Sequence, residues 1–509
     1  MATLRVYDTL RKRKVDFEPL DPGHVRLYVC GPTVYGLIHI GNARPMVAYD
    51  VAARHLRRRF PRVTYVRNIT DVDDKIIKRA AESGEEPGAL AARFTEEYRK
   101  DAASLCCRPP DFEPTVTAHI PEILAIIEQL LQRNMAYASD GDVYFDVARF
   151  PSYGALSGQP IDQLEAGARV ETSERKRSPL DFALWKAAKP GEPSWHAPWG
   201  DGRPGWHIEC SAMASRYLGE TFDLHGGGID LVFPHHENER AQSQGASGEE
   251  TFARHWLHNG FVNFNDQKIA KSDERMQHLL KRAFQLRGLV ERHGGEAVRY
   301  FLLSTQYRNP INFEVIEHGD DLRFPGLEEA ERQLEYGYLT VRRLAEALAV
   351  GKPAEPAQAG NPALAEGVAE WLPALDEALD EDFNTAGAYA ALQQGLGLAN
   401  RLLDGKLPAP KDVKRRSLEQ LARDLAVAAS VLGLLEADPA TWLAAHRLRR
   451  AAAKGIDSVA VETRIADRAA ARAARDFARS DLIRDELKQG GVELMDGASG
   501  TTWRVADQA

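Results

Sequence analysis

Hydrophobic and polar residues alternate at positions 25–29 of the chain, where the order Val-Arg-Leu-Tyr-Val predicts a β-strand. Apolar residues then recur at helical spacing over positions 43–59, which predicts a helix that ends in a basic run. A second β-rich run covers positions 63–69. A strand, a helix and a strand in this order predict a βαβ unit in a parallel sheet, with ligands above the carboxyl ends of its strands.

The pattern changes further along the chain. Between about positions 115 and 204, helical segments give way to a strand-like run at 142–147 and then to a stretch rich in Gly, Pro and Trp. This change predicts an insertion that splits the nucleotide-binding fold. Positions 324–444 are rich in Ala and Leu at three- and four-residue steps, which predicts a helical bundle. A last small unit spans about positions 456–505. The predicted fold class is therefore α/β, with a Rossmann-like parallel-sheet catalytic domain split by an insertion, then a helical bundle and a small C-terminal domain.

The composition, 44% apolar and 27% charged, is typical of a soluble globular protein, and 509 residues are too many for one ordinary core. Positions 1–17 mix charged and apolar residues, which argues against a secretory signal. The sequence contains no run of about 18 apolar residues, so we do not expect a membrane span. Because four cysteines are too few for a disulfide scaffold, we expect reduced thiols and a cytoplasmic location.

The net charge of −9 does not by itself suggest a nucleic-acid binder. An enzyme that binds RNA can nevertheless gather its basic residues on one face and be acidic overall. Positions 441–509 carry twelve Lys and Arg against ten Asp and Glu, so the end of the chain is slightly basic.

Two cysteines, a histidine and a glutamate form a candidate metal site. His235 and Glu239 are four residues apart, so a helix places both on one face, and Pro234 suits the start of that helix. Together with Cys30 and Cys210 they make a plausible zinc set, provided that the sheet brings the two cysteines together. The alternative is that both cysteines are core residues and that His235 caps a helix. His236 and Glu237, which lie between them, are expected to point elsewhere on the helix and to support the ligands or the structure.

A candidate nucleotide site begins with the segment His39-Ile-Gly-Asn42, between a predicted strand and a predicted helix. Gly41 has no Cβ, so a nucleotide can approach the backbone there. The helix N-terminus favours phosphate through its free N–H groups and its dipole. His39 and Asn42 can both donate hydrogen bonds toward a phosphate oxygen, although this short motif alone is weak.

Two further segments fit the same site. Lys268 and Lys271 stand three residues apart in a polar loop and can neutralise a triphosphate, although a solvated lysine pair is the plainer interpretation of that loop alone. A run of glycines around Gly227, followed by Asp230, allows close backbone approach and offers a carboxylate to ribose hydroxyls. A glycine run alone is more often just a turn.

Taken together, these segments resemble the cysteinyl-tRNA synthetases, a family of class I aminoacyl-tRNA synthetases. The matching motifs follow one another along nearly the whole chain, at positions 28–35, 39–42, 67–78, 205–210, 233–239, 382–385 and 500–503.

The resemblance implies ATP-dependent activation of L-cysteine to cysteinyl-adenylate and its transfer to the 3′ end of cysteine tRNA. It implies one Zn²⁺, bound by Cys30, Cys210, His235 and Glu239, which binds the substrate thiolate. A hydroxyl is a much weaker zinc ligand, so serine is rejected without an editing domain. ATP is expected with Mg²⁺. The amino acid is expected at Cys30, Thr70 and Trp206, and ATP at His39, Gly41, Asn42, Gly227, Asp230, Lys268, Lys271 and Ser272.

The resemblance also assigns roles to the other parts of the chain and favours a monomer. For tRNA we expect contacts from Arg472, Arg475, Arg479, Arg484 and Trp503, with a solvated helix face and a core tryptophan as the alternatives. The expected units are the two catalytic halves at 1–114 and 205–260, the connective insertion at 115–204, a signature-loop region at 261–323, the helical bundle at 324–450 and an anticodon-binding domain at 451–509.

The chain departs from the family pattern in its two signatures. The first often ends in His, where this chain has Asn42, which keeps a donor but cannot become cationic. The second usually reads Lys-Met-Ser-Lys-Ser, and here Ile269 and Ala270 replace the middle pair. The sequence after Ser272 also differs from the family continuation.

Three alternatives stay open. One is a cysteine:amino-sugar ligase of the mycothiol type, although such proteins are shorter at the C-terminus. Another is an inactive RNA-binding paralogue. The third is a side activity that forms persulfide, which in the family has been linked to the segment that matches Lys75 and Lys78 here. An exposed pair of lysines is the plainer interpretation of these two residues.

Overall fold

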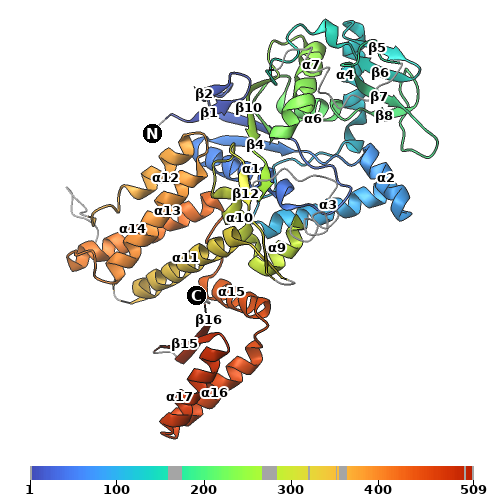
Figure 1. Ribbon diagram of the computed structural model, residues 1–509. Helices are drawn as coiled ribbons and strands as arrows, with labels where there is room; N and C mark the ends of the chain where they lie inside the picture. The colour runs from blue at the N-terminus through green and yellow to red at the C-terminus, as the bar shows by residue number, and fades with distance from the viewer. Residues whose placement is uncertain are drawn as a thin grey trace.

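We describe a computed structural model of the chain, covering residues 3–158, 175–265, 284–318, 321–350, 352–354, 364–497 and 500–506. A short antiparallel hairpin, β1 (Arg5–Asp8) and β2 (Arg13–Asp16), precedes the central sheet. The chain then forms the catalytic half, the insertion, a helical bundle and a small C-terminal unit (Figure 1).

The central sheet is parallel, as predicted. It contains β3 (His24–Val29), β4 (Arg62–Arg67), β9 (Phe222–Gly228) and β10 (Ala253–Asn259), in the order β10-β9-β3-β4. All three pairings are parallel, so the four strands end at the same edge. The predicted runs at 25–29 and 63–69 correspond to β3 and β4, within two residues at their ends.

Helices cover both faces of this sheet, which is why its strands are apolar on both sides. Leu27 points to the face covered by α1 (Ile40–Arg59), where it packs near Tyr49 and Leu56. Tyr28, the next residue of β3, points to the other face and packs with Ala212 of α6 (Ile208–Leu218). Each strand therefore contributes to two separate cores.

The chain leaves the parallel sheet after β4 and returns to it at β9, as the predicted insertion requires. In between lie α4 (Ile120–Gln132) and an antiparallel sheet in the order β5-β6-β7-β8, which stands beside α6 and α7 (Glu237–Ser247) in Figure 1. Its strands are β5 (Ala136–Ser139), β6 (Asp142–Phe145), β7 (Phe182–Ala187) and β8 (Gly202–Pro204).

Shorter elements complete the catalytic half. Those after β4 are α2 (Asp74–Ser83), α3 (Pro87–Ser104) and the single turns Thr117–His119 and Val147–Arg149. Those after β10 are β11 (Val262–Phe264), α9 (Leu286–His293), α10 (Gly295–Leu303), β12 (Ile311–Phe313), β13 (Ile316–His318) and β14 (Asp321–Arg323).

The predicted helical bundle is present and leads into the C-terminal unit. Its helices are α11 (Pro325–Ala349), α12 (Trp371–Asp380), α13 (Thr385–Leu403), α14 (Lys411–Leu432) and α15 (Pro439–Ala453). The C-terminal unit contains α16 (Ser458–Ala473), α17 (Phe477–Gln489) and the hairpin β15 (Val492–Gly497) and β16 (Gly500–Val505). The predicted boundary at residue 450 falls inside α15, so this helix joins the two units without a break.

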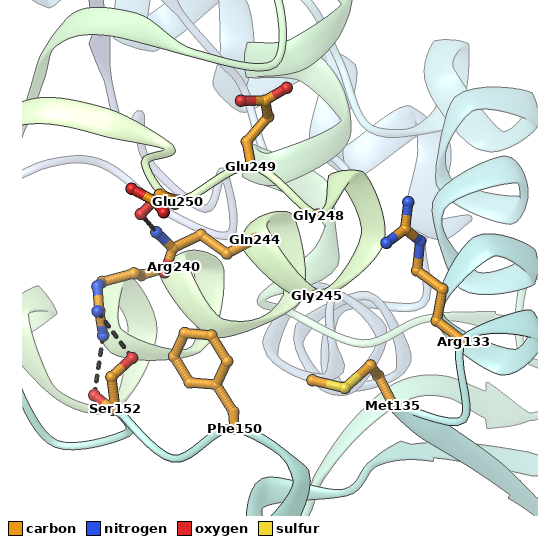
Figure 2. A pocket seen from close by; sticks show the side chains of 10 residues that line it. All are labelled: Arg133, Met135, Phe150, Ser152, Arg240, Gln244, Gly245, Gly248, Glu249 and Glu250. Carbon is orange, nitrogen blue, oxygen red and sulfur yellow. Dashed lines mark hydrogen bonds between the residues drawn. The ribbon is translucent and has the colours of Figure 1, made fainter.

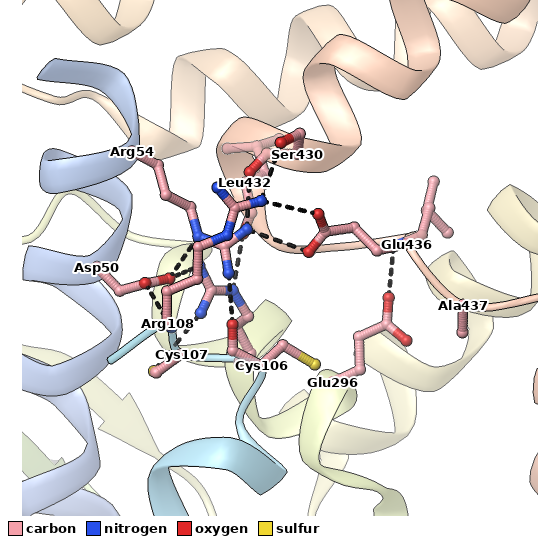
Figure 3. A network of polar contacts seen from close by, with 12 residues as sticks. Asp50, Arg54, Cys106, Cys107, Arg108, Glu296, Ser430, Leu432, Glu436 and Ala437 are labelled. Atoms are coloured by element: carbon pink, nitrogen blue, oxygen red, sulfur yellow. Dashed lines mark hydrogen bonds and ion pairs between the residues drawn. The ribbon is translucent and has the colours of Figure 1, made fainter. Parts of the chain in front are cut away.

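A buried polar network fastens α1 to the bundle (Figure 3). The Asp50 carboxylate accepts hydrogen bonds from Arg54 at 2.9 Å and from Arg299 of α10 at 2.6 Å. Arg54 also donates to the Ser430 carbonyl oxygen at 2.7 Å, and Arg299 donates to that of Leu432 at 2.7 Å. These two carbonyls belong to the last turn of α14, so one carboxylate on α1 orients the two arginines that hold the bundle.

We expect Asp50→Asn to lower the free energy of unfolding by about 3–5 kcal/mol, because buried Arg299 loses its counter-charge and buried Arg54 keeps only the exposed Glu436, at 3.1 Å. Urea unfolding followed by circular dichroism measures this change. The matched control is Asp376→Asn, which breaks the more exposed pair with Arg58 (2.8 Å) and should cost about 1 kcal/mol or less. Equal losses in the two variants would contradict this assignment.

Candidate metal centre and nucleotide site

The four predicted metal ligands come together at the carboxyl edge of the parallel sheet. The Sγ atom of Cys30, directly after β3, lies 3.6 Å from Sγ of Cys210, in the first turn of α6. It lies 3.5 Å from Nε2 of His235 and 3.4 Å from Oε1 of Glu239. All four candidate ligand atoms lie within 4.8 Å of one another.

This arrangement fits a tetrahedral zinc ion. With zinc–sulfur bonds near 2.3 Å and zinc–nitrogen bonds near 2.1 Å, the ligand atoms of such a site lie roughly 3.4–3.8 Å apart. The three distances from Cys30 fall in that range. Nε2 of His235 and Oε1 of Glu239 are closer, at 2.9 Å, which is a hydrogen-bond distance. A bound ion would hold this pair slightly further apart.

The charges of the cluster also favour a cation. Burial opposes the ionised form of Cys210, but the hydrogen bond with Cys30 and the bond and charge of His235 outweigh it and lower the pKa of Cys210 to about 6. Burial likewise acts against the ionised form of Glu239, yet His225 and His235 hold its pKa well below the usual range. A buried thiolate and a buried carboxylate are the donors that zinc prefers.

Two histidines orient these ligands, and neither was assigned this role from the sequence. Nε2 of His225 shares a hydrogen bond with Oε2 of Glu239 at 2.9 Å, and Nδ1 of His207 shares one with Nδ1 of His235 at 3.0 Å. Trp206 stacks on His235 with ring centroids 4.5 Å apart. Such partners fix the orientation of metal ligands. The sequence signals that could have indicated this role were the position of His207 inside the motif at 205–210 and that of His225 next to the glycine run.

His236, which was expected to support the ligands or the structure, lies directly beside the cluster. Its Nε2 lies 3.9 Å from Oε1 of Glu239, and with Cys30, His225 and Glu239 it forms a second group of four possible ligands. The helical backbone is broken at Phe233, where φ is −140° and ψ is 133°, just before α7 (Glu237–Ser247). Pro234 follows this break directly and stands at the start of the turn that leads into α7, as predicted. Glu237 does point elsewhere and accepts hydrogen bonds from the backbone of Leu156 and Ser157.

A surface cleft lies on another side of α7 and is separate from the metal cluster (Figure 2). It has a volume of about 460 Å³. Arg240 stands at its edge and donates to the carbonyl and hydroxyl oxygens of Ser152, both at 2.9 Å. None of the predicted site residues lines this cleft.

His39 and Asn42 form a capping box at the start of α1. The backbone N–H of Asn42 donates to Nδ1 of His39 at 3.3 Å, and that of His39 donates to Oδ1 of Asn42 at 3.1 Å. Because Nδ1 of His39 accepts, its proton stands on Nε2, which keeps a donor for a ligand. Among the described residues, the Nδ2 amide of Asn42 also keeps its donors for a ligand. A Cβ on Gly41 would lie 2.9 Å from the His39 imidazole. The lack of a side chain at Gly41 therefore leaves room for this ring.

The glycine run and Asp230 lie at the end of β9. The N–H of Gly227 donates to the Tyr49 hydroxyl at 2.8 Å, and a Cβ there would come within 2.7 Å of His236. Asp230 is exposed beyond the last residue of the strand. Thr70 is 2% exposed, whereas Trp206 is 39% exposed beside the metal cluster. Lys268, Lys271 and Ser272 lie outside the described residues.

In the C-terminal unit the predicted stacking of Trp503 on RNA is wrong. Its side chain is 2% exposed and packs in the core of this unit, and its Nε1 donates to Glu462 at 2.7 Å. The exposed aromatic side chain is Phe477, at 62%, at the start of α17. The sequence signal that could have indicated this exposure was the position of Phe477 beside a short connection between two helices.

The predicted arginines of this unit are all exposed but differ in their partners. Arg472 and Arg484 lie 3.6 Å and 2.8 Å from Asp496. Within the described part of the chain, Arg475 and Arg479 form no side-chain ion pair and stand on either side of Phe477. Lys75 lies over the Tyr35 ring, 5.5 Å from its centroid.

Comparison with known proteins identifies the family of this chain. Residues 16–318 match the family model of the class I (C) tRNA synthetase catalytic domain, and residues 374–436 match the DALR domain. A cysteine–tRNA ligase of Anaeromyxobacter sp. (strain K) is 51% identical over 508 residues, 99% of this chain and 100% of the relative. This chain belongs to the cysteine–tRNA ligase family.

Other relatives agree with this membership. The cysteine–tRNA ligase of Geobacter sulfurreducens is 46% identical over 504 residues, 99% of each chain. Among solved structures, the methionyl-tRNA synthetase of Mycobacterium tuberculosis bound to methionyl-adenylate has a TM-score of 0.58 at 15% identity, and the match covers 82% of this chain and 93% of that one. This likeness shows the fold of the ligase. Neither the amino-sugar ligase nor the inactive paralogue finds support in these comparisons. Within the described residues, no helix of this ligase is both long and apolar enough to span a bilayer.

We expect Gly41→Ala to raise the KM for ATP about tenfold in ATP–pyrophosphate exchange, because the added methyl group displaces the His39 imidazole. The KM for cysteine should change little. The matched control is Gly36→Ala, since a Cβ at Gly36 meets no atom within 4 Å. An unchanged KM for ATP in the Gly41 variant would contradict the phosphate-binding role of this turn.

Proposed function

We propose that this ligase activates L-cysteine with ATP and Mg²⁺ and transfers it to the 3′ end of cysteine tRNA, with one Zn²⁺ held by Cys30, Cys210, His235 and Glu239. The observation that carries the proposal is the convergence of two thiols, an imidazole and a carboxylate at the carboxyl edge of the parallel sheet. When bound, the zinc ion stabilises the thiolate form of the substrate cysteine and so separates it from serine.

The choice of this ligand set over the one with His225 and His236 rests on the thiols. Two sulfur donors favour zinc, whereas the second group has only one. His225 and His236 also have other tasks. His225 holds Oε2 of Glu239, and Nδ1 of His236 pairs with His258 at 2.8 Å.

In the first reaction step the cysteine carboxylate attacks the α-phosphate of ATP, the bond to the β-phosphate breaks, and pyrophosphate leaves. The Nε2–H of His39, the Asn42 amide and the N-terminus of α1 donate to phosphate oxygens, on which negative charge develops. Asp230 accepts from the ribose hydroxyls, and Gly227 lets the nucleotide approach the strand. Lys268, Lys271 and Ser272 are assigned to the phosphates by family resemblance.

In the second step the terminal ribose hydroxyl of tRNA attacks the carbonyl carbon of the adenylate, and AMP leaves. We assign the anticodon end of the tRNA to the C-terminal unit, where Phe477 offers a base-stacking surface between Arg475 and Arg479. The resemblance to the family also supports a monomer that acts in the cytoplasm.

The test combines metal analysis with two activity assays. Purified protein is expected to contain one zinc per chain, to catalyse cysteine-dependent ATP–pyrophosphate exchange and to charge cysteine tRNA. Exchange without charging would favour an amino-sugar ligase, and loss of both activities would contradict the proposal.

Removing one thiol separates the roles of metal and nucleotide. We expect Cys210→Ser to lower the zinc content below half and to raise the KM for cysteine by about a hundredfold, because a hydroxyl replaces a thiolate ligand. The KM for ATP should stay within about twofold of its original value. Cys106→Ser, away from the cluster, is the control. Similar increases in the KM for cysteine and the KM for ATP would overturn this division of roles.

Removing the exposed ring tests the tRNA contact. We expect Phe477→Ala to lower kcat/KM for tRNA charging by roughly five- to a hundredfold, in line with the loss of one stacked base. Pyrophosphate exchange, which needs no tRNA, should be unchanged. Leu482→Ala removes another exposed apolar side chain of α17, 57% exposed, and serves as the control. Equal effects in both variants would point to a general loss of surface contact.

A further inference from the structure

Arg44 is a buried cation close to the nucleotide turn. It lies on α1, two residues after Asn42, and is 1% exposed. Burial lowers the pKa of Arg44 to about 10, so its guanidinium group is still charged at neutral pH. Within the described residues, no carboxylate forms an ion pair with Arg44, and its Nε atom has no hydrogen-bond partner. Because a buried charge is costly without a counter-charge, this guanidinium is suited to an anionic ligand.

Backbone carbonyl groups hold the Arg44 side chain in place. Its Nη1 donates to the carbonyl oxygen of Phe261, directly beyond β10, at 2.5 Å. Its Nη2 donates to the carbonyl oxygen of Asn309 and lies 3.5 Å from that of Gln306. The Phe261 carbonyl oxygen also accepts from the N–H of Ile311 at 2.9 Å, which fixes it further. Carbonyl groups carry no net charge, so they position the guanidinium without neutralising it.

The hydrogen-bond donors of the nucleotide turn itself are neutral. Burial lowers the pKa of His39, and its Nδ1 accepts from the backbone of Asn42, so the imidazole is uncharged at neutral pH. The amide of Asn42 cannot become cationic. The helix N-terminus adds a partial charge of about +0.5. Phosphate groups carry full negative charges, which these neutral donors can orient but cannot balance.

Arg44 is placed to provide the missing charge. A rise of 1.5 Å per residue puts its Cα only about 3 Å further along the helix axis than that of Asn42. Burial keeps water and salt away from the guanidinium, so its field is screened less than that of a surface arginine. Arg58 provides a contrast on the same helix. It stands about 21 Å further along the axis, is partly exposed, and pairs with Asp376 at 2.8 Å.

We propose that Arg44 supplies the positive charge that attracts the phosphate groups of ATP to the turn at His39, without touching them. This inference rests on the proposed function, which places the phosphates at this turn. The neutral donors of His39 and Asn42 direct the hydrogen bonds, and Arg44 provides the counter-charge. The phosphates in turn are the counter-charge of the buried guanidinium, so binding favours both groups.

The experiment compares ligands that share a nucleoside and differ in their phosphates. The inhibition constants of adenosine and AMP, and the KM for ATP, are measured by cysteine-dependent pyrophosphate exchange in the unmodified protein and in Arg44→Gln. Glutamine keeps an amide donor for the carbonyl oxygens but carries no charge. We expect the constant for AMP and the KM for ATP to rise about tenfold, whereas the constant for adenosine should change less than about twofold.

The ratio of the AMP constant to the adenosine constant separates charge from structure, because a displaced Phe261 segment or poor folding weakens both ligands alike. Arg58→Gln removes a positive charge from the same helix and should leave the ratio unchanged. Arg44→Lys keeps the charge without the planar guanidinium and should keep the ratio within about threefold of its original value. This variant decides the question if Arg44→Gln does not fold.

Two results would overturn the proposal. One is an unchanged ratio in Arg44→Gln, whether both constants rise together or neither rises. The other is a tenfold rise of the ratio in Arg44→Lys, which would show that the charge is not what matters. If the unmodified protein lacks cysteine-dependent exchange, the proposed function fails by itself. Calorimetric titration of the unmodified protein and of Arg44→Gln with AMP and with adenosine then still tests the role of Arg44.

Discussion

The parallel pairing of β3 with β9 is the interaction on which the candidate site depends. It aligns Tyr28 with His225 and Val29 with Gly226, and the N–H of Cys30 extends it to the Gly226 carbonyl oxygen at 3.1 Å. These strands lie almost 200 residues apart in the sequence, on opposite sides of the insertion. A shift of one residue would turn every side chain of β3 to the other face and remove Cys30 from the cluster.

Helix α1 connects the nucleotide turn to the distant part of the molecule. Its first residue follows His39, and its middle carries Asp50 and Arg54, which hold the end of α14. The chain then turns into α15, which continues to the C-terminal unit (Figure 1). The end of α1 proposed to bind phosphate is therefore connected to the unit assigned to tRNA through α1 itself, the buried network and the end of α14.

The insertion contacts the helix that carries two of the candidate metal ligands. Glu237 holds the backbone of residues 156 and 157 against α7, two residues before Glu239. His235 is held in turn by His207 and Trp206, at the point where the chain leaves the insertion. The cluster is thus supported by both halves of the split fold and by the segment that splits it.

The sequence by itself determined the parallel βαβ unit, the order of the domains, the types of the metal ligands and the turn at His39. These features depend on local patterns, such as β-rich runs, helical spacing and the capping geometry of a helix start, or on motifs long enough to indicate the family. Tertiary structure alone decided which residues were buried and what they met. Glu209 became a buried acid that accepts a hydrogen bond from Thr70, His225 became the partner of Glu239, and Trp503 became a core residue while Phe477 stayed exposed. The reason is physical: burial and pairing arise from contacts between segments distant in the chain, and no local pattern of hydrophobic and polar residues specifies them.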